Sequence, residues 1–255
     1  MKPATNLLTK TSLPPFPGRT FPLQLLLLIG AVNFLFRYFL LGYGLTWDEA
    51  WILCSLKSLQ GGGTMFSNQL WRHPPLFMGF GLLLAPLKQG FELRMQLLTL
   101  GISTAALLVF LVLAARLFGK RIALMAGIAY ILLPGPFLFD TWIKRDPMVT
   151  LFCLTAILAF FHKQDWLAGI FLGLGFLSKE TSIFFAVGFI PLIMLHRPAG
   201  KKLPACLHIF VTATLTASWW YLLFANNSHE YVSFFKGSSL ENLEFEKPCG
   251  FTLPS

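Results

Sequence analysis

Apolar runs of about one membrane thickness recur along the chain, and they constrain its fold more than any other feature. The strongest occupy residues 21–42, 93–115, 122–139 and 204–224, and each contains few charges or none. A transmembrane helix needs about 20 consecutive apolar residues. In lipid, only helices and closed barrels satisfy all of their backbone polar groups. The long apolar runs, separated by short charged gaps, predict an all-α, polytopic membrane protein.

The composition supports this class. Hydrophobic residues make up 55% of the chain and charged residues 12%, whereas soluble proteins carry about 25% charged residues. The net charge is +9, which could suggest a nucleic-acid partner. However, the Lys and Arg residues lie in gaps between apolar runs and do not cluster on one polar face. We therefore expect no nucleic-acid binding.

Shorter apolar segments complete the expected membrane domain. They occupy residues 147–161, 166–178 and 181–196. Together with the longer runs they predict about seven transmembrane helices. This number assumes that each apolar run forms one helix.

Basic residues indicate the orientation of the chain. They are concentrated in segments that alternation places on one side of the membrane, namely 1–20, 116–121, 162–165 and 196–202. The positive-inside rule makes this side cytoplasmic. The expected domains are a cytoplasmic basic tail at 1–20, a membrane domain at 21–224 with an extracytoplasmic loop at 43–92, and an extracytoplasmic tail at 225–255.

The first extracytoplasmic loop contains too many charged residues to cross lipid as one segment. Its stretches 48–59 and 74–87 are expected to form short helices at the membrane interface. Trp47, Trp51 and Trp71 would anchor them there, because tryptophan favours the headgroup region.

Ionisable residues from five parts of the chain are expected to meet at the non-cytoplasmic face. Charged groups beside membrane spans are energetically expensive and usually functional. A pocket with both carboxylates and cations could take a proton from an acceptor and bind an anionic donor. The set comprises Asp48, Glu49, His73, Arg94, Asp140, Lys144, Arg145, Asp146, Lys179 and Glu180.

Several of these residues also have purely structural interpretations. Asp48 could cap an interfacial helix that starts at Glu49, and His73 could be an interfacial histidine without a chemical role. Arg94 could extend its charged end toward the membrane surface. For Asp146, which precedes Pro147, we favour a role as the N-cap of the next helix.

Six short motifs occur in a fixed order relative to the spans. They are Trp47-Asp48-Glu49-Ala50, His73-Pro74-Pro75-Leu76, Phe91-Glu92-Leu93-Arg94, Ala115-Arg116-Leu117-Phe118-Gly119, Lys144-Arg145-Asp146-Pro147 and Gly173-Leu174-Gly175-Phe176-Leu177-Ser178-Lys179. With these motifs in this order, the chain resembles a group of glycosyltransferases that use polyprenyl-phosphate-sugar donors. They are the protein O-mannosyltransferase and aminoarabinose transferase type, glycosyltransferase families 39 and 83. The resemblance covers about residues 21–197 and implies the N-terminal half of a GT-C fold.

The resemblance implies a function and roles for individual residues. Such enzymes transfer a sugar from a polyprenyl-phosphate donor to a protein, lipid or glycan acceptor on the non-cytoplasmic face. Asp48 is the expected general base, and Glu49 would assist it. Substrate binding would involve His73, with Arg94, Arg145 and Lys179 as candidates for the donor phosphate, because cations pair well with phosphate oxygens. No cofactor is expected, and the sequence shows no convincing cluster of metal ligands; it does not determine whether a metal is needed.

Members of this group continue with further spans, so we expect this chain to be a shortened or partial version. Two alternatives are a catalytically incomplete membrane scaffold and a transporter component. A transporter would place ionisable residues near mid-span, but residues 95–114 and 122–138 are almost free of charge. The expected location is the inner membrane if the protein is bacterial, and the endoplasmic reticulum if it is eukaryotic.

Overall fold

The computed structural model describes residues 21–41, 49–50, 52–54, 56, 74–84 and 90–226. Within these residues the secondary structure is helical and contains no strand, which confirms the all-α expectation for this part of the chain. Asp48, His73, the 1–20 tail and residues 227–255 lie outside the described residues. The expectations for them stay predictions.

The helices follow the apolar runs closely. Their bounds are α1 Leu23–Tyr38, α3 Leu76–Leu84, α4 Phe91–Phe118, α5 Lys120–Leu132, α6 Pro134–Thr141, α7 Asp146–Phe161, α8 Asp165–Ser178, the 3₁₀ helix η1 Glu180–Ser182, α9 Ile183–His196 and α10 Ala199–Asn226. Further helical residues precede α3 between 49 and 56. Of the two interfacial helices expected in the first loop, 74–87 therefore corresponds to the shorter α3.

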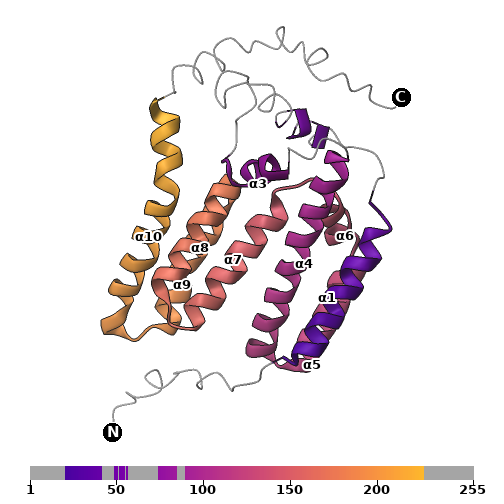
Figure 1. Cartoon of the computed structure of the whole chain (residues 1–255). Coiled ribbons are helices and arrows are strands. Elements are labelled where there is room, and N and C mark those ends of the chain that lie inside the picture. The colour runs from indigo at the N-terminus through magenta and orange to yellow at the C-terminus, as the bar shows by residue number, and fades with distance from the viewer. Residues whose placement is uncertain are drawn as a thin grey trace.

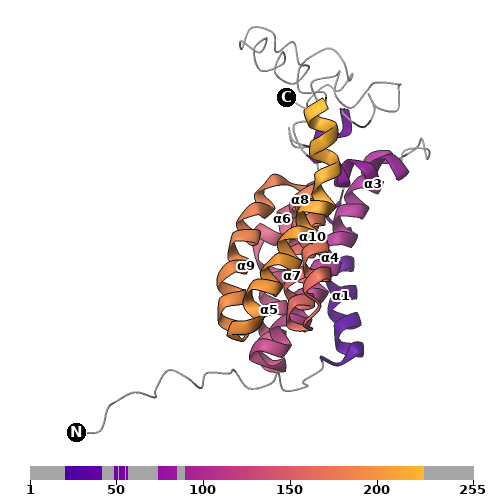
Figure 2. The ribbon, with the colours of Figure 1, turned by 90° about the vertical axis from the view of Figure 1, so that its left-hand side faces the viewer.

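The long helices stand side by side in the order α10, α8, α7 and α4 (Figure 1). Helices α1 and α5 both pack against α4, and α9 packs against α8 and α10. Figure 2 shows α9 and α1 on opposite sides of this bundle. Consecutive long helices therefore run up and down, as the alternation of apolar runs and short gaps predicts.

The bundle has two chemically different ends. The end at which α1 begins also carries the turns at 118–120, 161–165 and 196–199 (Figure 1), and we call it the basic end. There Arg116 contacts His162, and Arg197 pairs with Asp165 and donates a hydrogen bond to the Phe160 carbonyl at 2.8 Å. The opposite end, which we call the α3 end, carries α3, the start of α4, and the turns at 141–146 and 178–182.

Only part of the expected membrane topology is established. Among the described residues, α4 is the one helix that is both long and apolar enough to cross a membrane. It has 28 residues, or about 42 Å at 1.5 Å per residue, against a hydrocarbon thickness of about 30 Å. Helices α1, α7, α8 and the stretch 180–196 are apolar but shorter. Seven transmembrane helices are therefore not confirmed.

Large apolar side chains are exposed along several helices. Leu27 and Leu28 of α1, Met125 of α5, and Leu195 of α9 are each more than half exposed. Extended apolar surface of this kind is unusual on a water-soluble monomer. It is consistent with contact between these helices and lipid.

The run at 122–139 does not form one helix, so that prediction was wrong. Helix α5 ends at Leu132, Leu133 is extended (φ −70°, ψ 132°), and α6 starts at Pro134. Proline has no backbone N–H, and its ring also disfavours the helical conformation of the preceding residue. The break therefore follows from Pro134, and it leaves the Tyr130 carbonyl without the donor that residue 134 would otherwise supply.

Two glycines one turn apart bring α8 and α10 into close contact. A Cβ atom at Gly169 would overlap the Thr212 side chain and the Ile209 carbonyl oxygen, and one at Gly173 would lie 2.7 Å from the Ala213 carbonyl oxygen. Small residues four positions apart allow helix backbones to approach closely in membrane proteins. The α8–α10 contact therefore depends on the absence of side chains at Gly169 and Gly173.

A buried apolar cluster lies beneath the segment around Glu49. Ile52, Leu53 and Leu56 are almost fully buried and pack with side chains from α3, α4, α7, α8 and α10. A Cβ atom at Gly81 of α3 would lie 2.8 Å from the Leu56 side chain. This packing fixes the segment that contains Glu49 against the α3 end of the bundle.

Candidate functional site

Glu49 is held against the loop between α6 and α7. Its side chain is fully buried, and its Oε1 accepts a hydrogen bond of 2.7 Å from the Ile143 backbone N–H. A buried carboxylate needs such donors because it has lost its hydration. The predicted acidic segment is therefore attached to a part of the chain more than 90 residues away in sequence.

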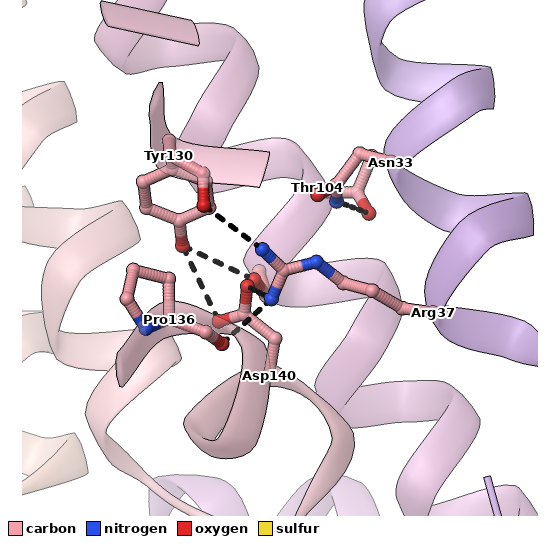
Figure 3. A network of polar contacts seen from close by, with 7 residues as sticks. Asn33, Arg37, Thr104, Tyr130, Pro136 and Asp140 are labelled. Carbon is pink, nitrogen blue, oxygen red and sulfur yellow. Dashed lines mark hydrogen bonds and ion pairs between the residues drawn. The ribbon is translucent and has the colours of Figure 1, made fainter. Parts of the chain in front are cut away.

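A buried ion pair lies between α1 and α6 (Figure 3). The guanidinium of Arg37 pairs with the carboxylate of Asp140, and the two side chains are 0% and 3% exposed. The Tyr130 hydroxyl donates a hydrogen bond of 3.3 Å to Asp140 Oδ1. The guanidinium carbon of Arg37 also lies over the Tyr130 ring, 5.4 Å from the ring centroid. The buried charges are thus surrounded by polar or aromatic partners.

Arg37 also compensates for the helix break at Pro134. Its Nη2 donates to the Tyr130 carbonyl at 3.2 Å, which is the carbonyl that the proline leaves without a backbone donor. Its Nη1 donates to the Pro136 carbonyl at 2.6 Å. In lipid, helix-breaking prolines are tolerated where neighbouring helices satisfy the freed backbone groups. Arg37 does so from α1.

Lys179 and Asp146 form a second ion pair at the α3 end. Lys179 Nζ lies 2.7 Å from Asp146 Oδ1, and the two side chains are 26% and 42% exposed. Asp146 is the first residue of α7, and that helix has no side-chain N-cap hydrogen bond. The expectation that Asp146 is an N-cap was therefore wrong. Its carboxylate is oriented toward Lys179 at the end of α8.

The other predicted site residues lie at the same end where they are described. Arg94 is in the first turn of α4, and Arg145 directly precedes α7; both are partly buried and have polar or ring partners. Asp48 directly precedes Glu49 in the sequence but lies outside the described residues, as does His73.

Residues 140–146 connect these features. The segment begins at Asp140, which pairs with Arg37, and ends at Asp146, which pairs with Lys179. Between them, Ile143 donates its N–H to Glu49. One short segment therefore links the acidic loop, helix α1 and the end of α8.

Sequence reasoning assigned no role to Arg37 or Tyr130. Arg37 was counted within an apolar run, although a charged residue inside such a run is itself a signal of a buried partner. Its partner Asp140 follows Pro134 and Pro136, which mark a helix break. These two signals together could have suggested the pair.

An apolar cavity of about 400 Å³ lies between α8, η1, α9 and α10. Its lining includes Phe176, Ile183, Phe210 and Ser182. The Ser182 hydroxyl is buried and has no hydrogen-bond partner within the described residues. Ser182 lies one turn after Lys179, whose carbonyl accepts its N–H at 3.1 Å. One lining residue of the cavity is therefore bonded to the backbone of Lys179.

The described residues contain no group of three or more His, Cys, Asp or Glu side chains that could hold a metal ion. Their charged groups at the α3 end include the Lys179–Asp146 pair and the carboxylate of Glu49, which accepts a hydrogen bond from a backbone N–H.

The family model of dolichyl-phosphate-mannose-protein mannosyltransferases matches residues 72–222, more than half of the chain. The chain belongs to this family. The resemblance drawn from the motif order is thereby confirmed. No curated protein and no solved structure matches the chain.

Membership in the mannosyltransferase family indicates that this chain is a glycosyltransferase of membranes. Members of the family are integral membrane proteins, with which the apolar helix α4 agrees. The matched region runs from just before α3 into α10. It includes Arg94, Arg145 and Lys179, whereas Asp48 and Glu49 precede it.

Proposed function

We propose that this protein is a multi-pass membrane glycosyltransferase that moves a sugar from a polyprenyl-phosphate donor to an acceptor at the α3 end. The observation that carries the proposal is that a buried carboxylate, Glu49, and a partly exposed cation, Lys179, are both tied to residues 140–146. In this orientation the basic end faces the cytoplasm, following the positive-inside rule. The α3 end then faces the opposite compartment.

Asp48 is the proposed general base. Its neighbour Glu49 is fully buried and bonded to Ile143, so the backbone that carries Asp48 is anchored on its C-terminal side. Asp48 takes the proton from an acceptor hydroxyl as the acceptor oxygen attacks the anomeric carbon. The bond from that carbon to the phosphate oxygen breaks, and the lipid phosphate leaves with its electron pair. A single displacement inverts the anomeric centre.

Lys179 is the proposed first contact of the donor phosphate, with Arg94 and Arg145 as further candidates. The ammonium of Lys179 is about one quarter exposed and is balanced by Asp146. A phosphate carries stronger and more numerous acceptor oxygens than one carboxylate, so it competes well for a partly exposed cation. His73 is proposed to contact the sugar or the acceptor.

The cavity between α8, α9 and α10 is proposed to hold the first part of the polyprenyl chain. Its lining is almost entirely apolar, and its lining residue Ser182 lies one turn from Lys179. A donor with its phosphate at Lys179 would therefore have an apolar space for the adjoining hydrocarbon. The unpartnered Ser182 hydroxyl could donate to an oxygen of the phosphate linkage.

The direct test is transfer of a radiolabelled sugar from polyprenyl-phosphate donors in membranes that contain the full chain. The wild-type chain is expected to transfer label, and Asp48→Asn is expected to abolish transfer while membrane insertion stays normal. Equal transfer by Asp48→Asn would remove Asp48 from the base role. Absence of transfer by the wild-type chain with every donor would favour the catalytically incomplete scaffold.

A further inference from the structure

The Arg37–Asp140 pair is buried far more completely than its chemistry favours. Both side chains are at most 3% exposed, and Arg37 Nε has no partner within the described residues. Taking an ion pair out of water is so costly that apolar replacements are often neutral or stabilising. Folding stability alone therefore does not account for a charged pair at these two positions. The contacts that Arg37 makes with α5 and α6 suggest another role.

Arg37 fixes the position of α6 through three separate contacts. It pairs with Asp140 near the end of α6, donates to Pro136 in the first turn, and donates to Tyr130 in the last turn of α5. Without Arg37, the Tyr130 carbonyl and the Asp140 carboxylate would both lose a charged donor. The short helix α6 is therefore held against α1 at both of its ends.

The position of α6 determines where the Ile143 amide lies. Asp140 and Ile143 are three residues apart, which limits their separation to about 10 Å, so the Ile143 amide stays close to the end of α6. The Ile143 N–H is the donor that binds Glu49. The ion pair thus fixes the helix that immediately precedes the donor of the Glu49–Ile143 hydrogen bond.

We propose that Arg37 and Asp140 are positioning residues for the acidic segment, acting through α6 and the Ile143 amide on Glu49 and its neighbour Asp48. The effect on transfer rests on the proposed function, whereas the effect on the Ile143 amide does not. A displacement of about 1 Å in a catalytic group can lower a rate about 100-fold. Loss of the pair is therefore expected to lower kcat strongly and to leave the donor KM near its wild-type value.

Three variants of the full chain test the proposal. Asp140→Asn removes one charge with little change in size, and the double variant Arg37→Met/Asp140→Leu replaces both charges by apolar groups. The matched control is Asp165→Asn, because Asp165 pairs with Arg197 at the opposite, basic end. Two quantities are measured in detergent, namely hydrogen exchange at the Ile143 amide and the melting temperature. Sugar transfer is measured in membranes.

Asp140→Asn is expected to lose protection of the Ile143 amide and about 100-fold in kcat. The double variant leaves no uncompensated buried charge, so it is expected to melt at a higher temperature than Asp140→Asn, but below the wild type because the Tyr130 and Pro136 carbonyls lose their donor. It is expected to regain neither the protection of the Ile143 amide nor the rate of transfer, whereas a pair with only a structural role would regain them together with stability. Asp165→Asn is expected to retain both the protection and the rate. If Asp140→Asn fails to insert into the membrane, the exchange of the Ile143 amide and the transfer rate of the double variant test the proposal.

Any one of three results would overturn the proposal. The first is a double variant that recovers protection and transfer together with stability. The second is unchanged protection of Ile143 in the variants that lack Asp140, and the third is equal loss of protection in Asp165→Asn. If the wild-type chain transfers no sugar, the proposed function fails, but the exchange of the Ile143 amide still tests the positioning role.

Discussion

Glu49 Oε1 accepts a hydrogen bond of 2.7 Å from the Ile143 N–H, across 94 positions of sequence. Glu49→Ala would leave this buried N–H unpaired, which costs about 1–3 kcal/mol. Glu49→Gln retains an acceptor oxygen and should lose less stability. The measurement is the melting temperature of both purified variants in detergent. Equal melting temperatures for the Ala and Gln variants would contradict the importance of this bond.

Lys179 should affect donor binding more than stability. Its pair with Asp146 is partly exposed, and exposed pairs contribute about 0–1 kcal/mol. Lys179→Met is therefore expected to leave the melting temperature almost unchanged and to raise the KM for the polyprenyl-phosphate donor. Lys179→Arg keeps the positive charge and should retain most of the affinity.

The measurement for Lys179 is the steady-state rate of transfer as a function of donor concentration. The same assay on Asp146→Asn separates the two members of the pair, because this variant frees the Lys179 ammonium. An unchanged donor KM in Lys179→Met would exclude Lys179 from phosphate binding.

The contact between α8 and α10 should be sensitive to a single methyl group. Gly169→Ala places a Cβ against the Ile209 carbonyl oxygen, which is backbone and cannot rotate away. Overpacking of this kind costs about 1–3 kcal/mol. The control is Gly188→Ala in α9, where a Cβ meets no atom within 4 Å. Alanine favours the helix more than glycine does, so this variant should gain up to about 1 kcal/mol of stability. Thermal unfolding of both variants in detergent should show opposite shifts.

The orientation of the bundle can be tested by cysteine labelling in sealed vesicles. In a background with Cys54, Cys153, Cys206 and Cys249 replaced, a reagent that cannot cross membranes is expected to label Lys144→Cys from the non-cytoplasmic side. Lys163→Cys and Lys201→Cys, which replace exposed residues of the basic end, should be labelled only after the cytoplasmic side is opened. Labelling of all three positions from the same side would refute the proposed topology.

The sequence predicts the helices well because lipid leaves a chain few alternatives. Helices α4, α7 and α8 each lie within about three residues of their apolar runs. The sequence predicts α5 and α6 poorly, because an apolar run shows no change in hydropathy at Pro134. The helix break there depends on the missing N–H of Pro134 and on the side chain of Arg37, which bonds the Tyr130 carbonyl instead.

The candidate site was predictable as a set of residues but not as a set of contacts. The order of motifs places Glu49, Arg145 and Lys179 at one end of the bundle. It does not show that Glu49 binds the Ile143 backbone or that Lys179 binds Asp146. Such pairings depend on the exact offset between helices, which is set by packing such as that at Gly169 and Gly173.

The proline at position 134 makes the backbone around it dependent on Arg37 of another helix. With Arg37 in place, the Tyr130 carbonyl that Pro134 leaves without a backbone donor has a side-chain donor; without Arg37 it loses that donor. Asp140 in turn requires a cation beside it. Positions 37, 134 and 140 are therefore expected to change together during descent, so that related chains keep the arginine and the aspartate as a pair or lose both.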